Sequence, residues 1–174
     1  MRTRDMAYIA LLAVVISICS WISVPMTVPF TMQTFAIFCA LLLLGGKRGF
    51  IAIVLYVLMG MVGLPVFSGF RSGIATLTGP TGGYILGFII CGAFYWIFEK
   101  RMKDWLLLAI GNILCYAFGT AWFVYVYVSG GKAMTFGAAL LACVVPYIIP
   151  DAAKLALALL VSKRIKPHIK ACRL

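Results

Sequence analysis

The chain has 174 residues, of which 64% are hydrophobic and 11% are charged, and its formal net charge is +11. Soluble proteins carry about 25% charged residues, so this composition excludes a soluble domain of useful size and indicates an integral membrane protein. Apolar runs of about 20 residues, the length with which a helix crosses a bilayer, predict one membrane domain over residues 1–174. The basic clusters flank these runs, which indicates membrane topology and contact with the lipid bilayer, not nucleic-acid binding.

The apolar runs predict an all-α protein with six transmembrane helices. The second and third helices are short and meet at a tight basic turn, Gly45-Gly46-Lys47-Arg48. The sixth run is longer than a membrane core, and Pro146 and Pro150 predict a break midway along it. The predicted spans cover about 6–24, 31–46, 48–63, 81–98, 105–128 and 135–162.

The basic residues are distributed unevenly between the two sides of this arrangement. Arg71 and Lys132 fall on one side, and twelve basic residues fall on the other. By the positive-inside rule, both termini are predicted to be cytoplasmic, which agrees with an even number of spans. The twelve are Arg2, Arg4, Lys47, Arg48, Lys100, Arg101, Lys103, Lys163, Arg164, Lys166, Lys170 and Arg173.

The first predicted helix carries small side chains on a narrow stripe: Ala7, Ala10, Ala13 and Ser17. Small residues let the backbones of two helices approach closely within a membrane. This stripe therefore predicts a docking surface for a partner protein.

The first outer loop contains Pro25 and Pro29, which cannot lie in a regular helix interior and favour extended backbone before them. Non-helical backbone near membrane depth is tolerated against protein or a wet cavity. Thr31, Gln33 and Thr34 follow at once and could present polar groups to such a cavity. An ordinary capped entry into the second helix is the alternative.

The second outer stretch, residues 63–84, is rich in glycine and predicts a lid over a binding site. Phe67 offers apolar contact area, and Gly69 permits close backbone approach. Arg71 could attract an anion, although an arginine in an outer loop is often simply solvated. At Thr81-Gly82-Gly83-Tyr84 the first amides of the fourth helix are predicted to point outward, which suits a carboxylate or another hydrogen-bond acceptor.

Asp151 and Lys154 form the most unusual feature of the apolar part of the chain, because charges are expensive in hydrocarbon and usually face a cavity or a partner. Their spacing places both on one helix face, where each can neutralise the other. The pair therefore predicts a binding site. The alternative is a structural pair that locks two helices together.

No catalytic or metal site is expected. The single histidine, His168, lies in the basic tail, and the carboxylates are too few for metal-dependent chemistry. The six cysteines contain no C-x-x-C pair, so neither a zinc site nor a disulfide framework is indicated. We therefore expect a protein that is not an enzyme and needs no cofactor.

Four separated motifs resemble the BioY family, the substrate-binding S components of energy-coupling factor (ECF) biotin transporters of prokaryotes. The resemblance covers nearly the whole chain. The motifs are Val28-Pro29-Phe30-Thr31-Met32-Gln33-Thr34; Leu55-Tyr56 with Gly60 and Gly63-Leu64-Pro65-Val66-Phe67; Gly79-Pro80-Thr81-Gly82-Gly83-Tyr84 with Gly87-Phe88; and Pro146-Tyr147 with Pro150-Asp151 and Lys154.

The resemblance implies a six-helix S-component fold in the cell membrane and a high-affinity site for biotin, the transported substrate, under the two outer loops. It also implies a transmembrane coupling subunit and two ATPase subunits as partners. S components of this kind dock through A-x-x-x-A on the first helix, whereas here only Ala13-x-x-x-Ser17 has that spacing. The candidate biotin-binding residues are Gln33, Thr34, Phe67, Gly69, Arg71, Thr81, Gly82, Tyr84, Tyr147, Asp151 and Lys154.

Biotin offers a ureido group with two N–H donors and one acceptor, an apolar ring system and a carboxylate tail. Asp151 can accept a ureido N–H, and Lys154 can donate to a carbonyl or carboxylate. The sequence leaves open which end of biotin meets the pair. The rival function is a stand-alone proton-coupled carrier of biotin or another small carboxylate, with Asp151 as the protonation site.

Overall fold

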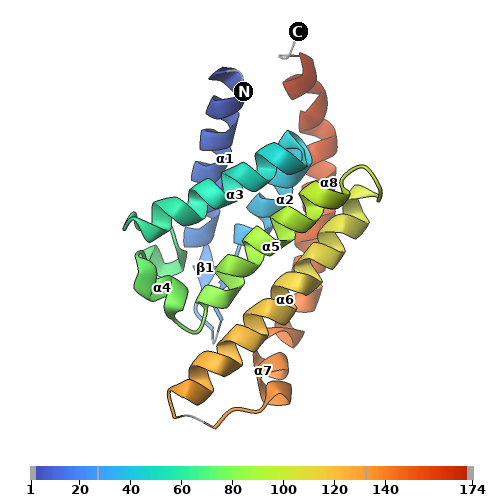
Figure 1. Ribbon diagram of the computed structural model, residues 1–174. Helices are drawn as coiled ribbons and strands as arrows, with labels where there is room; N and C mark the ends of the chain where they lie inside the picture. Colours follow the sequence, from blue (N-terminus) through green and yellow to red (C-terminus); the bar gives the residue numbers. More distant parts are fainter. Residues whose placement is uncertain (1–2, 27, 132, 172–174) are drawn as a thin grey trace.

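The computed structural model describes residues 3–26, 28–131 and 133–171, with side chains as far as Pro167. The described chain is mostly helical, with one short hairpin near its first quarter (Figure 1). In chain order the elements are α1 (Thr3–Trp21), β1 (Ser23–Val24), β2 (Phe30–Thr31), α2 (Gln33–Leu44), α3 (Gly46–Met61), η1 (Ser68–Phe70), α4 (Ile74–Thr78), α5 (Gly82–Phe98), α6 (Asp104–Ser129), α7 (Phe136–Cys143) and α8 (Val145–Ala171).

Five of these helices coincide with the first five predicted helical runs to within three residues at each end: α1, α2, α3, α5 and α6. In the described part of the chain, three helices are long and apolar enough to cross a membrane: α1, α6 and α8. Two more, α2 and α5, are apolar but shorter. The protein is therefore a helical protein with membrane-spanning capacity. That six segments cross the membrane stays a prediction.

The predicted break midway along the sixth run is wrong in position. The break separates α7, which ends at Cys143, from α8, which begins directly after Val144. The φ and ψ of Val144 are −124° and −53°, which are not helical values. Pro146 falls in the first turn of α8, where the missing N–H removes no helical hydrogen bond, and Pro150 is accommodated inside the helix. Asp151 therefore lies on a continuous helix.

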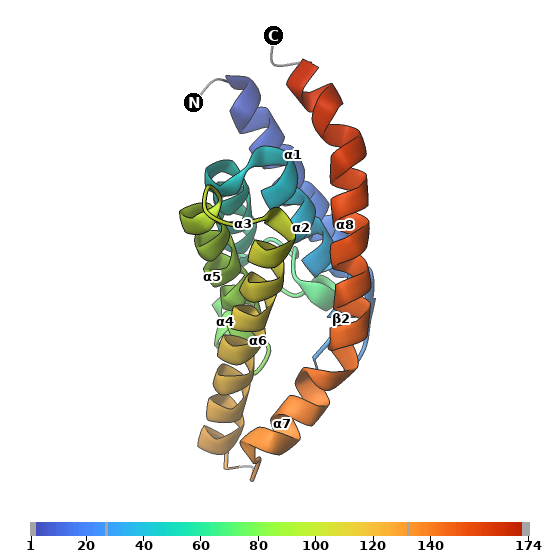
Figure 2. The same cartoon turned by 90° about the vertical axis from the view of Figure 1, so that its right-hand side faces the viewer.

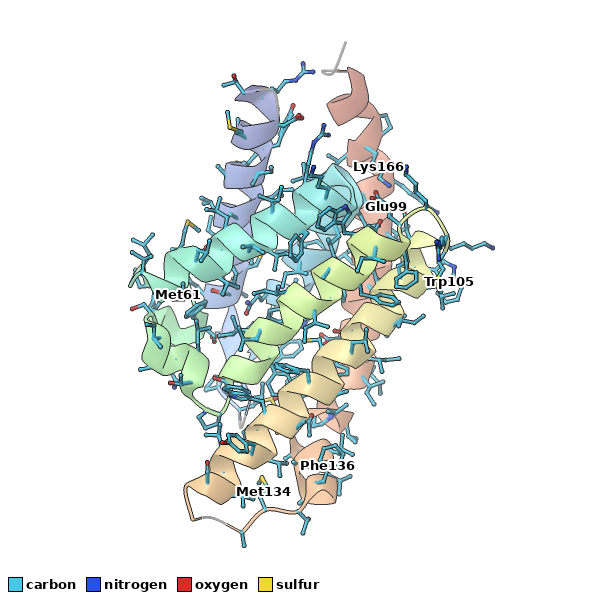
Figure 3. All side chains as sticks on the ribbon, viewed as in Figure 1. Met61, Glu99, Trp105, Met134, Phe136 and Lys166 are labelled. Carbon is cyan, nitrogen blue, oxygen red and sulfur yellow. The ribbon has the colours of Figure 1, made fainter. Side chains whose placement is uncertain are left out.

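Both described ends of the chain lie at the same end of the molecule (Figures 1 and 2). Glu99 and Lys166 lie toward this end, whereas Met134 and Phe136 lie at the opposite end (Figure 3). This arrangement suits an even number of crossings. The placement of the termini in the cytoplasm stays a prediction. Some of the basic residues used to predict the orientation lie outside the part of the chain that the structure describes. They are Arg2, Lys132, Arg173 and the side chain of Lys170.

Glycines let α5 and α6 pack closely side by side (Figure 1). A Cβ atom on Gly87 would lie 2.8 Å from Cys115 Sγ, and one on Gly111 would lie 2.7 Å from Cys91 Sγ. Each helix thus contributes one glycine and one cysteine to the contact, as expected where small residues permit close approach. This contact places the Tyr84 end of α5 beside α6, where a cavity forms.

The first outer loop is a β-hairpin, which confirms that this proline-containing segment is not helical. Ser23 pairs with Thr31 and Val24 with Phe30 in antiparallel register. The hairpin delivers Thr31 to the start of α2, next to α8.

The second outer loop is fastened to the helices beneath it. Phe67 N donates to Arg71 O at 3.0 Å, and Gly73 N donates to the carbonyl of Gly60 on α3 at 2.7 Å. The Phe67 ring lies directly on Gly60, where a Cβ atom would come within 2.1 Å of it. Trp21 on α1 donates its indole N–H to Pro65 O at 2.9 Å. That the loop is a mobile lid stays a prediction.

Candidate binding site

A cavity lies between the hairpin, the second outer loop and α2, α5, α6, α7 and α8. Its walls are mainly apolar, with a few polar and charged groups, which is typical of small-molecule sites. The lining residues are Val28, Pro29, Thr31, Gln33, Thr34, Phe67, Ser68, Arg71, Thr76, Thr81, Tyr84, Ile85, Phe88, Asn112, Cys115, Tyr116, Cys143, Tyr147, Asp151 and Lys154.

Nine of the eleven candidate residues meet at this cavity although they come from four separate parts of the chain. Gly69 and Gly82 do not line it. Gly69 is exposed in η1 with a φ of 68°, a value that favours glycine, so its role is to form the turn. A Cβ atom on Gly82 would lie 1.8 Å from Leu77 O, so its role is to let α5 pack against α4. The nine are Gln33, Thr34, Phe67, Arg71, Thr81, Tyr84, Tyr147, Asp151 and Lys154.

The Asp151–Lys154 pair forms a buried salt bridge in the cavity wall. Lys154 Nζ lies 2.7 Å from Asp151 Oδ1, and the two side chains are 7% and 5% exposed, respectively. Lys154 Nζ also donates to Thr31 O at 2.6 Å and to Thr34 Oγ1 at 3.1 Å. The ammonium therefore uses all three donors on protein acceptors. It also lies 3.9 Å from the ring centroid of Phe30, a favourable cation–π distance.

Asp151 is held from three helices. Thr34 on α2 donates to Oδ1 at 3.2 Å, Tyr116 on α6 donates to Oδ2, and Lys154 on α8 completes the set. A carboxylate has about four lone-pair sites, so one acceptor position remains after these three contacts. The site can therefore offer a negatively charged acceptor to a ligand donor.

Tyr116 and Asn112 are lining residues that are absent from the candidate residues of the sequence analysis. They lie four residues apart on one face of α6, and both line the cavity. The signal that could have found them is this i, i+4 spacing of two polar side chains on an apolar helix.

The aromatic side chains of the wall direct their polar tips to the protein. Tyr84 and Thr120 share a hydrogen bond of 3.0 Å between their hydroxyls, and the Tyr147 hydroxyl donates to Val28 O. Because these hydroxyls are satisfied by the protein, the rings of Tyr84 and Tyr147 offer mainly apolar surface to a ligand.

The predicted anion site at the start of α5 has two of its first-turn amides engaged with the protein. Gly82 N donates to Gly79 O at 3.0 Å, and Tyr84 N donates to Thr81 O at 3.2 Å. These two amides are not free to bind a carboxylate, and an anion site at this helix end stays a prediction. Among the lining residues, Arg71 is an exposed cation in the outer loop.

The predicted small-residue stripe of α1 is divided between two faces. Ala7 and Ala10 are exposed, whereas Ala13 is 0% exposed and Ser17 is 3% exposed. Ser17 donates its hydroxyl to Ala13 O at 3.0 Å. Ala13 and Ser17 are thus internal packing positions. A partner could meet only the Ala7 and Ala10 side of α1, where the exposed Leu11 also lies.

The helical arrangement is similar to that of a solved S component. It matches the solved structure of the S-component for biotin from an ECF-type ABC transporter with a TM-score of 0.84, covering 96% of this chain and 95% of that one at 24% identity. This likeness establishes the fold.

The family model for BioY matches residues 1–171. A probable biotin transporter BioY from Pyrococcus horikoshii is 35% identical over 167 residues, which is 95% of this chain and 98% of that protein. The biotin transporter BioY of Thermotoga maritima is 37% identical over 169 residues, with 94% and 96% covered. The chain belongs to the BioY family.

Proposed function

We propose that this protein is the high-affinity biotin-binding subunit of a vitamin uptake transporter in a prokaryotic cell membrane. The observation that carries the proposal is the Asp151–Lys154 ion pair in the wall of a largely apolar cavity. A pair that only joined two helices would gain nothing from facing a cavity, whereas ligand sites combine apolar walls with a few placed polar groups. The names of the full-length relatives support biotin as the ligand.

Biotin binds with its ureido ring toward Asp151 and its carboxylate toward Arg71. A ligand carboxylate near Asp151 would meet a like charge, and the Lys154 donors that could offset this are already engaged. The carboxylate of Asp151 instead suits a ureido N–H. Arg71, an exposed cation in the outer loop, suits the tail.

The apolar ring system of biotin lies between these two ends. Phe67, Ile85 and Phe88 are buried side chains of the lining and offer apolar contact. The Tyr147 ring closes another side of the cavity. Burying an apolar surface in such a site contributes roughly 25 cal/mol per Å² before the costs of association.

Transport requires partners, namely a transmembrane coupling subunit and two ATPase subunits. The sequence has no G-x-x-x-x-G-K-[ST] phosphate-binding loop, so ATP hydrolysis must be supplied from outside this chain. The coupling subunit docks on the Ala7 and Ala10 face of α1. The chain crosses the membrane six times with both termini in the cytoplasm, and the cavity opens toward the outside.

The buried ion pair disfavours a proton-coupled carrier. Asp151 is the charge that balances Lys154 in the buried wall, so a neutral Asp151 would leave Lys154 as a buried cation without its counter-ion. A carrier that protonated this carboxylate in each cycle would have to break the ion pair each time.

The test is equilibrium binding of labelled biotin to the purified protein in detergent. We expect near-stoichiometric binding that unlabelled biotin displaces. Lipoate also has an apolar ring and a carboxylate tail but no ureido group, so it should compete poorly. Equal competition by lipoate would contradict the ureido assignment, and an absence of biotin binding would overturn the function.

A further inference from the structure

A buried pair of hydrogen-bonded polar side chains, Gln33 and Tyr56, joins the cavity wall to α3. Gln33, which lines the cavity, is 5% exposed and donates Nε2–H to the Tyr56 hydroxyl at 2.9 Å. Tyr56 lies on α3, is fully buried, and is not part of the cavity lining. It reaches the site only through Gln33.

This hydrogen bond fixes which end of the Gln33 amide faces Tyr56. Nε2–H donates to the Tyr56 oxygen, so the donor end of the amide is used on the protein. An amide has one donor end and one acceptor end, so Gln33 is left with Oε1 as the atom that a ligand can meet.

We propose that Tyr56 is a positioning residue that orients the Gln33 amide so that the cavity presents a hydrogen-bond acceptor there. This inference rests on the proposed biotin function and adds a reason for ligand choice. Asp151 is a second acceptor, and it is hydrogen-bonded to Thr34, the neighbour of Gln33 in sequence. Two acceptors in one wall select a ligand with two N–H donors at one end, the chemistry of a cyclic urea.

The proposal predicts that Tyr56→Phe weakens biotin binding about 10-fold, the effect of one hydrogen bond. Phenylalanine keeps the ring that packs edge-on against Phe67 with centroids 5.6 Å apart, so the change removes only the hydroxyl. The matched control is Tyr95→Phe. Tyr95 is equally buried and donates to Asp104 at 3.0 Å, but it does not line the cavity, so the control should lower the melting temperature and leave biotin affinity unchanged.

A double-mutant comparison separates positioning from a general structural role. If Tyr56 acts through Gln33, Tyr56→Phe should have no further effect on affinity in a Gln33→Ala background.

The ratio of the affinities for biotin and for biotin methylated at a ureido nitrogen distinguishes positioning from a general structural defect. A structural defect would weaken both ligands equally and leave this ratio unchanged. Parental protein should prefer biotin over the methylated ligand, and Tyr56→Phe should reduce that preference about 10-fold. An unchanged preference, or an equal loss with and without Gln33, would overturn the role of Tyr56 while leaving biotin binding intact. A parent that fails to bind biotin would overturn the proposed function itself.

Discussion

Tyr116 on α6 donates a hydrogen bond to Oδ2 of Asp151 on α8, so the carboxylate in the cavity wall is held by two facing helices. Lys154 and Thr34 both contact the other oxygen, Oδ1. The two carboxylate oxygens therefore have separate supports, and the plane of the group is fixed before any ligand arrives. A preorganised acceptor of this kind lowers the cost of binding.

We predict that Tyr116→Phe weakens biotin binding by roughly 10-fold to 100-fold, because a hydrogen bond to a charged group contributes about 1.5 to 3 kcal/mol. The measurement is equilibrium binding in detergent. Tyr125→Phe is the control, since Tyr125 is an exposed tyrosine on the same helix and is not part of the cavity lining. Unchanged affinity in Tyr116→Phe would show that Asp151 does not need this support.

Lys154→Met should destabilise the protein and abolish binding. It leaves Asp151 as a buried charge without its partner, and breaking such a pair costs about 3 to 5 kcal/mol. The double variant Asp151→Asn, Lys154→Met removes both charges. We expect it to recover much of the melting temperature but not the binding of biotin.

The comparison between these two variants separates a structural pair from a binding pair. If the double variant bound biotin as the parent does, the charges would serve only to hold helices together. If it recovered neither stability nor binding, the destabilisation would come from lost packing and not from the unpaired charge.

Arg71→Ala should weaken biotin about 5-fold, because exposed charge pairs contribute about 1 kcal/mol or less. Biotin methyl ester lacks the charged tail, so its affinity should not change. Arg101→Ala is the control, since Arg101 is exposed and lies in the loop between α5 and α6, away from the lining residues. An equal loss of affinity for biotin and for its methyl ester would show that the biotin carboxylate does not bind Arg71.

Ala10→Leu should abolish uptake by the complete transporter in vesicles while leaving biotin affinity in detergent unchanged. Ala10 is exposed on α1, where a larger side chain would keep a docking helix away. Ala13→Leu should behave differently because Ala13 is fully buried, and overpacking costs typically about 1 to 3 kcal/mol. Uptake at the parental rate in Ala10→Leu would contradict docking at this face.

Apolar run length was enough to predict the main helices because each predicted run is bounded by prolines, glycines or basic residues. The break in the last run was misplaced because a proline in the first turn of a helix costs nothing. Pro146 therefore marks the start of α8 and not its interruption. The sequence alone does not show which of these two positions a proline occupies.

The charged pair was predictable since charges are rare in apolar segments, but its partners were not. Tyr116 became visible only once the packing of α6 against α8 was known, because its distance from Asp151 along the chain is 35 residues. Tyr56 was noted within a motif but not as a functional residue, because its hydroxyl acts through Gln33. The α1 stripe was misassigned for a related reason: residue size does not reveal which face of a helix is buried.

The central claim is that Asp151 accepts a hydrogen bond from bound biotin, and Asp151→Asn tests it most directly because asparagine has nearly the same shape without the charge. The measurement is the dissociation constant for labelled biotin of this variant and the parent, with the melting temperature recorded for both. We predict a loss of about 100-fold or more in affinity, in line with the 2 to 5 kcal/mol cost of truncating a buried charged hydrogen-bond partner. A folded Asp151→Asn variant that binds biotin as tightly as the parent would contradict the claim.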